Sequence, residues 1–229
     1  MKHVAIVQSN YIPWKGYFDL IASVDEFIIY DAVQYTHRDW RNRNRIKTPQ
    51  GVHWLTVPVL TKGRANQAIR DACIEGREWA TVHWRTIQSN YARAPHFEQI
   101  AASLEPIYKN PPPNLSALNE QLIKSICVML GISTRITTDR NYRMVEGKLL
   151  RAADLCEQAG ATTYVSGPAA KAYLDESILR ARDIQVEWFD YSGYPEYPQL
   201  WGNFVHEVSI LDLLFNCGPD APRYMKYVR

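Results

Sequence analysis

The sequence has no apolar run as long as the roughly eighteen residues that a membrane-spanning helix needs. Its longest apolar stretches, Phe27–Tyr30 and Ile210–Phe215, are short or interrupted by charge. Residues 1–8 also lack the apolar core and the small-residue cleavage site of a signal peptide, and instead they predict a β-strand. We therefore expect a cytoplasmic protein with no membrane partner.

Cysteine pairs, histidine pairs and an excess of one charge are also missing. The four cysteines, at positions 73, 127, 156 and 217, form no CxxC motif, which argues against a zinc or redox site and favours free buried thiols in a reducing compartment. No serine lies in a GxSxG motif, so a hydrolase nucleophile is not supported. A formal net charge of +2 argues against a nucleic-acid partner.

Short apolar segments alternate with amphipathic ones, and this order predicts an α/β fold. We expect a Rossmann-like, doubly wound and mostly parallel sheet in a single domain, residues 1–229, with a β-hairpin at 41–60 and a structural helical insertion at 78–131 without site residues. The expected strands are 3–8, 27–30, 135–138, 162–166 and 184–189. The other expected helices are 16–23, 146–159, 169–180 and 209–216.

The segment Gln8-Ser-Asn-Tyr-Ile-Pro-Trp-Lys-Gly-Tyr17 connects the first strand to the first helix. In open α/β sheets, ligands bind outside the carboxyl ends of the strands, where a helix N-terminus faces an anion. Gly16 would let the backbone approach such a ligand, and Lys15 supplies a positive charge. The alternative is a polar connecting loop whose Pro and Trp pack on the sheet.

A basic segment, residues 31–47, follows the second strand. Arg41, Arg43, Arg45 and Lys47 are spaced by two, so in a strand they share one face, while Asn42 and Asn44 point to the other. A row of guanidinium groups suits phosphate, although a solvated edge strand also carries such charges. Asp31, at the end of the second strand, is either a structural carboxylate or the base of a reaction.

A third segment, Thr163-Tyr-Val-Ser-Gly-Pro-Ala-Ala-Lys171, passes from a strand through a turn into a helix. Pro168 suits the first helical position, and Ser166 suits the preceding N-cap. The same helix start, with Lys171 one turn later, could bind an anion. We expect Lys15, Asp31 and Ser166 to open onto one crevice, because parallel strands end on one side of a sheet.

With these residues the chain resembles the WbqC-like protein family. The resemblance is carried by residues 8–21, by Asp31, Gln34 and residues 39–46, by residues 54–59, and by Tyr164-Val-Ser-Gly167 with residues 173–174 and 209–216. It implies a setting in bacterial O-antigen, other polysaccharide or specialised-metabolite biosynthesis. The role proposed for the family, glycine transfer to an amino sugar, implies an aminoacyl transferase.

A shorter resemblance connects the chain to nucleotidylyltransferase-like α/β proteins. Trp14-Lys-Gly-Tyr17 stands in the place of their HxGH motif, and Ser166-Gly-Pro-Ala-Ala-Lys171 in the place of their later serine motif. Both motif histidines are missing, so the resemblance implies binding of a nucleotide or nucleotide-linked sugar more than nucleotidyl transfer. Hence a non-catalytic nucleotide-sugar binding protein is the alternative function.

We therefore expect a small anionic ligand, a nucleotide sugar, as the partner. ATP or another nucleotide is compatible as a cofactor, but the sequence selects none; it offers no metal site, and it does not define an oligomeric state. The candidate catalytic residues are Asp31, as base, and Lys15. The candidate substrate-binding residues are Gln8, Asn10, Tyr11, Gly16, Gln34, Arg41, Asn42, Arg43, Ser166, Gly167 and Lys171.

Overall fold

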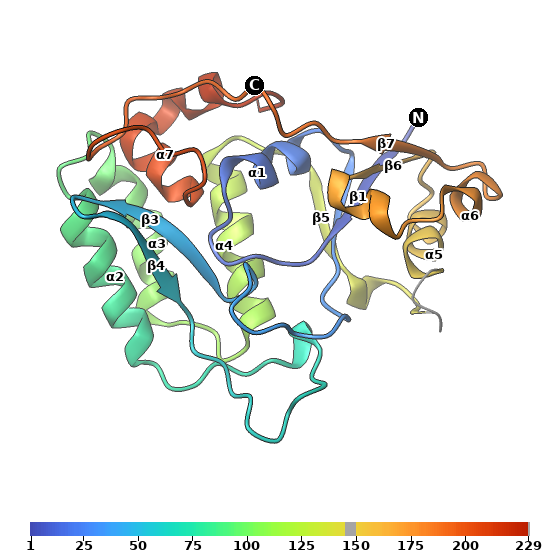
Figure 1. Ribbon diagram of the computed structural model, residues 1–229, viewed down its shortest axis with the longest axis horizontal. Coiled ribbons are helices and arrows are strands. Elements are labelled where there is room, and N and C mark those ends of the chain that lie inside the picture. The colour runs from blue at the N-terminus through green and yellow to red at the C-terminus, as the bar shows by residue number, and fades with distance from the viewer. Residues whose placement is uncertain (145–149, 229) are drawn as a thin grey trace.

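The computed structural model describes residues 1–144 and 150–228, and over these residues five parallel strands form one sheet (Figure 1). The strand order is β5-β2-β1-β6-β7, so the chain leaves β1 in one direction for β2 and β5 and later returns beside β1. This confirms the predicted Rossmann-like α/β fold. The strands are β1 (His3–Val7), β2 (Glu26–Ile29), β5 (Arg135–Thr138), β6 (Thr163–Ser166) and β7 (Gln185–Trp188).

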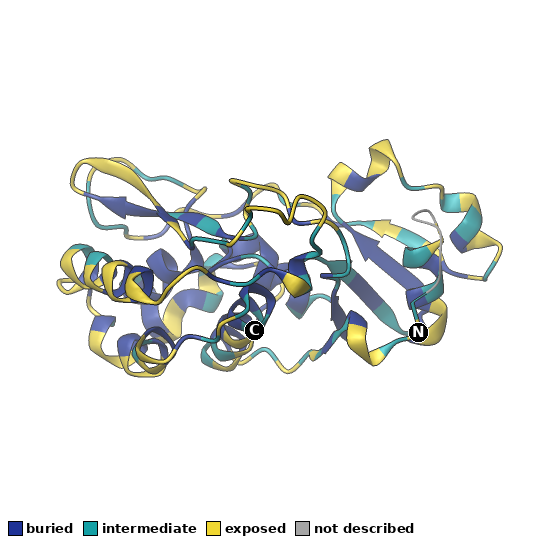
Figure 2. Ribbon diagram, turned by 90° about the horizontal axis from the view of Figure 1, so that it is seen from below, coloured by how far each residue is buried: buried dark blue, intermediate teal, exposed yellow. Residues whose placement is uncertain are grey.

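Both faces of the sheet are covered. Neighbouring strand residues point to opposite sides, so the side chains of each face pack into a core of their own. Ala5 belongs to the larger core cluster with Phe18 of α1 (Lys15–Ala22), whereas Val4 belongs to a smaller cluster with Leu155 of α5 (Arg151–Gln158). Strands β2 and β6 are accordingly buried along their whole length, β1 is buried in part, and the outer strands β5 and β7 are more exposed (Figure 2). The apolar run Phe27–Ile29 of β2 reflects burial on both faces of the sheet.

Three helices between β2 and β5 contribute a large part of the larger core. α2 (Glu78–Tyr91), α3 (Phe97–Lys109) and α4 (Leu115–Met129) lie side by side (Figure 1), as the apolar spacing of the sequence predicts. The side chain of Asn114 caps α4 after the proline-rich link. The assignment of residues 78–131 as an insertion within one domain stays a prediction.

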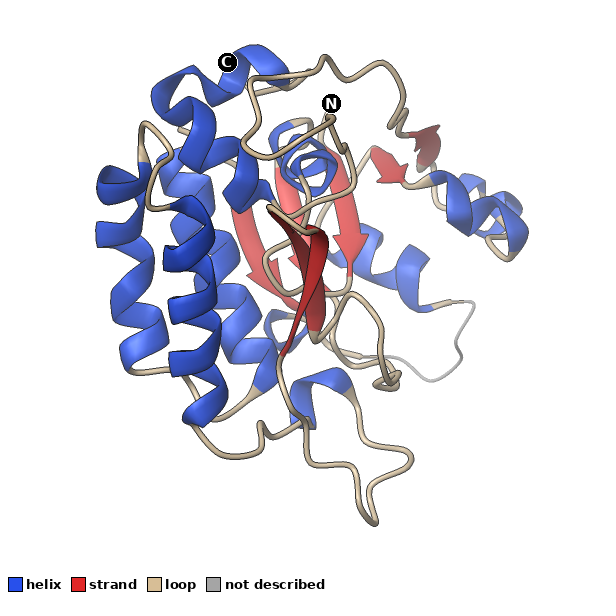
Figure 3. Cartoon of the chain, turned by 60° about the vertical axis from the view of Figure 1, so that its left-hand side comes forward, coloured by secondary structure: helices blue, strands red, loops and turns tan. Residues whose placement is uncertain are grey.

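A two-stranded antiparallel hairpin lies apart from the main sheet, in front of it in Figure 3. It consists of β3 (Arg43–Thr48) and β4 (Gly51–Thr56), which confirms the predicted hairpin. Gly51 has a φ of +105°, a conformation that glycine adopts without strain. The register places Arg45 opposite Trp54, a pairing that matters for the site.

The C-terminal half departs from expectation at 169–180, where one helix was predicted. Instead a 3-10 helix, η3 (Pro168–Ala172), is followed by a separate short helix, α6 (Glu176–Arg180). A new helix begins here because Asp175 is its N-cap: the Asp175 carboxylate accepts a hydrogen bond from the Ser177 N–H group. The first turn expected for the 146–159 helix lies outside the described residues, and α5 is described from Arg151.

The last α-helix, α7 (Ile210–Cys217), begins as predicted after Ser209, whose side chain accepts from the Leu211 N–H group. Residues 189–209, between β7 and α7, contain no regular helix or strand. The remaining described elements are the 3-10 helices η1 (Ile69–Asp71), η2 (Asp139–Asn141) and η4 (Gly218–Tyr224).

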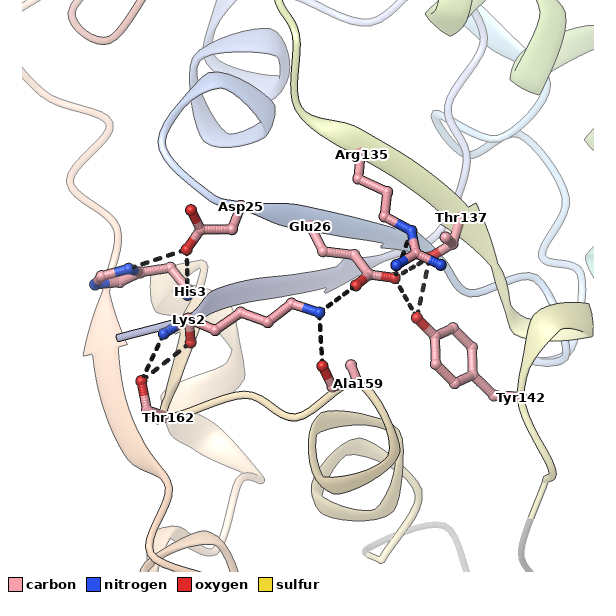
Figure 4. A network of polar contacts seen from close by, with 9 residues as sticks. All are labelled: Lys2, His3, Asp25, Glu26, Arg135, Thr137, Tyr142, Ala159 and Thr162. Atoms are coloured by element: carbon pink, nitrogen blue, oxygen red, sulfur yellow. Dashed lines mark hydrogen bonds and ion pairs between the residues drawn. The ribbon is translucent and has the colours of Figure 1, made fainter.

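A polar network ties the amino ends of the strands together (Figure 4). The buried Glu26 carboxylate accepts hydrogen bonds from Lys2 Nζ at 2.7 Å, from Thr137 Oγ1 at 2.9 Å and from the Tyr142 hydroxyl. Burial would raise the pKa of Glu26, but these hydrogen bonds outweigh it and the pKa is lowered. This network lies at the edge of the sheet opposite the carboxyl ends of the strands, where open α/β sheets bind their ligands.

Candidate functional site

The carboxyl ends of β1, β2 and β5 meet at Asp31. Its Oδ1 accepts from the Ser9 N–H group at 2.8 Å, and its Oδ2 accepts from the Ser116 hydroxyl on α4. The Asp139 carboxylate, after β5, accepts in turn from the Asp31 N–H group at 2.8 Å. Burial raises the pKa of Asp31 despite the hydrogen bonds from Ser116 and Ser9. Asp31 therefore holds three strand ends together from inside the protein.

Arg41 joins the loop after β1 to the basic segment. Its Nη1 donates to Asn10 Oδ1 at 2.5 Å and its Nη2 to Gln8 Oε1 at 3.3 Å. The Asn119 amide of α4 bridges the Arg41 carbonyl and the Ser9 hydroxyl, at 2.9 and 3.0 Å. Three predicted site residues thus come together, and an asparagine from the helical segment fixes them.

Tyr11 points away from this group into the helical core. Its hydroxyl lies 2.9 Å from His83 Nδ1 and 2.8 Å from the Tyr108 hydroxyl, and burial raises its pKa well above the usual range. The Tyr11 N–H group donates to the carbonyl of Trp40 at 2.9 Å. Tyr11 therefore anchors the β1 loop to α2 and α3.

The start of α1 is occupied by side chains of the protein itself. The Trp14 ring packs onto Gly16 so closely that a Cβ there would overlap it. Lys15 is buried; its Nζ donates to the Pro195 carbonyl at 2.9 Å and lies 5.0 Å from the centre of the Tyr197 ring. Burial lowers the pKa of Lys15 to about 8. In this structure Gly16 makes room for an indole and Lys15 binds the 189–209 segment.

The predicted segment after β6 faces other partners. Ser166 is not the N-cap of the following helix; that position is Gly167, and the Ser166 hydroxyl donates to the Tyr164 hydroxyl at 3.3 Å. Gly167 lies against the ring of Tyr191, and Lys171 Nζ lies 5.3 Å from the centre of the Trp188 ring. Pro168 occupies the first turn as predicted.

A chain of contacts fills the space between the ends of β1 and β6. The Trp14 ring, which covers Gly16, lies 5.5 Å from the Tyr191 ring, which covers Gly167. The space where a crevice is expected, at this reversal of the strand order, is thus filled by aromatic rings. Lys15, Asp31 and Ser166 have their side chains bonded to different internal partners.

The cations of the basic segment have different surroundings. Arg41 precedes β3, and Lys47 is buried with its Nζ donating to Gln199 Oε1 at 2.7 Å, so the predicted row of four cations is incomplete. Arg43 and Arg45 do share a face, where their guanidinium carbons lie 4.1 and 5.5 Å from the centre of the Trp54 ring. These two arginines face outward on an aromatic support.

Three polar residues of the basic segment have structural partners. Asn42 Nδ2 donates to the Val57 carbonyl at 2.8 Å, and Asn44 Nδ2 donates to the Tyr11 carbonyl at 3.1 Å. Both asparagines are buried, on the side opposite the arginines as alternation predicts. Gln34 is exposed and its Nε2 donates to the Ala65 carbonyl at 3.1 Å.

A cavity of about 390 Å³ lies between the β1 loop and the hairpin. We call it the tryptophan cleft, and its lining residues are Asn10, Pro13, Trp14, Trp40, Asn44, Arg45 and Glu207. It combines apolar ring surface with the ion pair between Arg45 Nη2 and Glu207 Oε2, at 3.0 Å. Apolar walls with a few converging polar groups are typical of small-molecule sites.

Two other cavities contain none of the predicted site residues. One of about 610 Å³ lies along α6 and β7, and one of about 340 Å³ lies between α2 and α3. The tryptophan cleft, in contrast, includes Asn10 and adjoins Arg41 through the Asn10 side chain. We therefore take it as the candidate functional site.

Several residues in the cleft or beside it were not predicted as site residues from the sequence. Trp40 and Trp54 are 41% and 38% exposed, and their ring centres are 5.4 Å apart. Interleaving of Trp40 with arginines was a visible signal, but Glu207 and Asn119 lie in segments without a motif. Asn119 also shows that the helical segment contributes a residue that supports the predicted site.

The described residues offer no group of three or more His, Cys, Asp or Glu side chains able to hold a metal ion. Among them no helix has the length and apolar character required to cross a bilayer. All four cysteines carry free thiols.

Comparison with known proteins places the chain in a family. No solved structure matches it significantly. It is 59% identical over 230 residues, covering 100% of both chains, to an uncharacterized protein, Rv1507c, of Mycobacterium tuberculosis (strain ATCC 25618 / H37Rv). The model of the WbqC-like protein family matches residues 8–224, and the chain therefore belongs to the WbqC-like protein family.

Proposed function

We propose that the chain is an aminoacyl transferase that adds a glycyl-type group to an amino sugar, bound as its nucleotide conjugate, in bacterial polysaccharide or specialised-metabolite biosynthesis. The observation that carries this proposal is the composition of the tryptophan cleft. Its two indole rings suit the apolar face of a sugar, and Glu207 and Arg45 suit an ammonium and a phosphate group. Family membership supports the same role.

The chemistry requires a base near the acceptor amine. The amine nitrogen attacks the carbonyl carbon of an activated glycyl group, the bond to the leaving group breaks, and the ammonium proton passes to a carboxylate. Glu207 lines the cleft and its side chain is 76% exposed, whereas both oxygens of Asp31 accept hydrogen bonds within the protein. We therefore assign the base to Glu207 and give Asp31 and Lys15 positioning roles.

The donor must carry its glycyl group in activated form, as a carrier thioester, an aminoacyl-tRNA or a phosphate anhydride made with ATP. The free thiols fit the reducing cytoplasm in which such donors and nucleotide sugars are found. A cytoplasmic location is thus part of the same proposal.

A thermal-shift and mass-spectrometry experiment tests this function. Nucleotide-linked amino sugars should raise the melting temperature more than the matched hydroxyl sugars, since a ligand at a hundred times its Kd adds about 2.7 kcal/mol of stability. With a glycyl donor, the acceptor mass should increase by one glycyl residue. Trp40→Leu should reduce both effects, whereas Tyr173→Leu, at another exposed ring, should reduce neither. A protein that no amino sugar stabilises would refute the proposal.

The alternative, a binding protein without turnover, is favoured by one observation. The lining of the tryptophan cleft contains no Ser, Thr, Cys, Lys or His side chain, and its single carboxylate is paired with Arg45. Stabilisation by amino sugars without any mass change, across the three donor classes, would select this alternative.

A further inference from the structure

A second cavity of about 270 Å³ adjoins the tryptophan cleft. We call it the arginine cavity, and its lining residues are Arg38, Asp39, Trp40, Arg43, Arg45 and Trp54. Trp40 and Arg45 line both cavities, so the two spaces share one wall and one cation. A ligand in one cavity would therefore contact a residue that also faces the other.

The arginine cavity has an excess of positive charge. Three guanidinium groups face one carboxylate, that of Asp39. Its Oδ2 accepts from the Thr36 hydroxyl at 2.7 Å and also lies 3.7 Å from Arg41 Nη2, while its Oδ1 accepts from the Trp40 N–H group. Both oxygens of Asp39 are thus engaged within the protein, and the three guanidinium groups suit an anion with several oxygens.

The arginines are already oriented in the free protein. The guanidinium carbon of Arg43 lies 4.1 Å from the centre of the Trp54 ring, and that of Arg45 lies 5.8 Å from the centre of Trp40. Stacking on an indole leaves the N–H groups at the guanidinium edge able to donate to oxygens. Nε of both arginines is buried and has no hydrogen-bond partner within the described part of the chain.

Arg45 has a partner that can release it. Its Nη2 donates to Glu207 Oε2, but the Arg45 side chain is 20% exposed while that of Glu207 is 76% exposed. Exposed ion pairs contribute little stability, so an oxygen-rich anion can replace Glu207 as the partner of Arg45. Glu207 would then be free for a cation in the tryptophan cleft.

Resting on the proposed function, we infer that the arginine cavity binds the diphosphate of the same sugar conjugate, and that Arg45 couples it to the tryptophan cleft by exchanging Glu207 for phosphate oxygens. The freed Glu207 carboxylate takes the acceptor ammonium. Diphosphate and amino sugar then bind with positive coupling. Thermodynamic linkage requires that each raises the binding affinity of the other by the same factor.

Isothermal titration calorimetry with inorganic pyrophosphate and glucosamine tests this inference. Saturating glucosamine should raise the pyrophosphate affinity about fivefold or more, and saturating pyrophosphate should raise the glucosamine affinity equally. Arg45→Lys should weaken pyrophosphate binding about tenfold, because one charge-assisted hydrogen bond is lost. The same variant should abolish the coupling between the two ligands. Glu207→Gln should weaken glucosamine binding while pyrophosphate still binds.

A matched control is Arg182→Lys, because Arg182 pairs with the exposed Glu157 at 3.1 Å and its side chain is 28% exposed. It should bind both probes like the unaltered protein, and all variants should keep the native circular dichroism spectrum. Unchanged pyrophosphate affinity in Arg45→Lys and Arg43→Lys would overturn the subsite. Binding of both probes without coupling would overturn the exchange and leave the proposed function standing. Pyrophosphate binding without glucosamine binding would keep the subsite and refute that function.

Discussion

His83 offers a quantitative test of how the β1 loop is held. It lies on α2, is buried beside Trp79, and shares a hydrogen bond with the Tyr11 hydroxyl. Burial lowers the pKa of His83 from its ordinary value of 6.5 to about 4, because a charged imidazole would lose its hydration there. Protonation of His83 should therefore oppose folding.

The magnitude follows from that shift. A difference of about 2.5 pKa units at about 1.36 kcal/mol per unit corresponds to about 3 kcal/mol. In the unfolded chain His83 takes up a proton as the pH falls through 6.5, whereas in the folded protein it resists until about 4. The contribution of neutral His83 to the unfolding free energy should thus be complete above pH 6.5. About 3 kcal/mol of this free energy should be lost as the pH falls from 6.5 to 4.

Urea unfolding at several pH values between 7 and 4 measures this effect. His83→Gln, whose amide can still bond to Tyr11, should be less stable than the unaltered protein at pH 7, and the difference should shrink by about 3 kcal/mol toward pH 4. His37→Gln, at an exposed histidine, should follow the unaltered protein at every pH. Parallel curves for His83→Gln and the unaltered protein would refute a neutral, buried His83.

Three further predictions concern stability and loop positioning. Glu26→Gln should lower the unfolding free energy at pH 7 by about 1–3 kcal/mol. This loss should fade as the pH falls toward 3, since a carboxylate of lowered pKa stabilises fully above its unfolded pKa and loses that contribution as it becomes protonated in the folded protein; urea curves with an undiminished loss at pH 3 would contradict this. Asn119→Ala should lower the unfolding free energy in urea by about 1–3 kcal/mol and weaken pyrophosphate binding in calorimetry, because Arg41 and Ser9 lose the amide that bridges them. An unchanged unfolding free energy together with an unchanged pyrophosphate affinity would contradict this prediction. Leu118→Ala should lower the unfolding free energy in the same urea assay by about 2–5 kcal/mol but leave the pyrophosphate affinity unchanged, since the Leu118 side chain is fully buried in the core. A smaller loss of unfolding free energy would contradict this prediction.

The elements that could be predicted from the sequence are those with a strong local pattern. The apolar strand at 3–8 and the capped helix after Ser209 occur within a residue of the expected bounds. Both depend on neighbouring residues, namely an apolar run and a serine that accepts from the helix start. The helices between residues 78 and 131 were predictable for the same reason.

Side-chain partners across long sequence separations could not be predicted in this way. Ser166 suits an N-cap by its position before Pro168, yet its hydroxyl donates to Tyr164 instead. Lys15 precedes a glycine in a motif typical of anion sites, but Pro195, 180 residues later, accepts its hydrogen bond. The sequence alone gives no register between the β1 loop and the 189–209 segment.

The location of the cleft follows from the aromatic residues that surround it. In an open α/β sheet the space between the ends of β1 and β6 is the usual ligand crevice, but Trp14 and Tyr191 fill it here. The hairpin that carries Arg45 lies beside the β1 loop, held through the hydrogen bond from Asn44 to the Tyr11 carbonyl. The open space is therefore bounded by Trp14 on the sheet side and by the hairpin on the other. A charged edge strand would not need indole rings to support its two outward-facing arginines, so this arrangement favours a ligand site over the edge-strand interpretation.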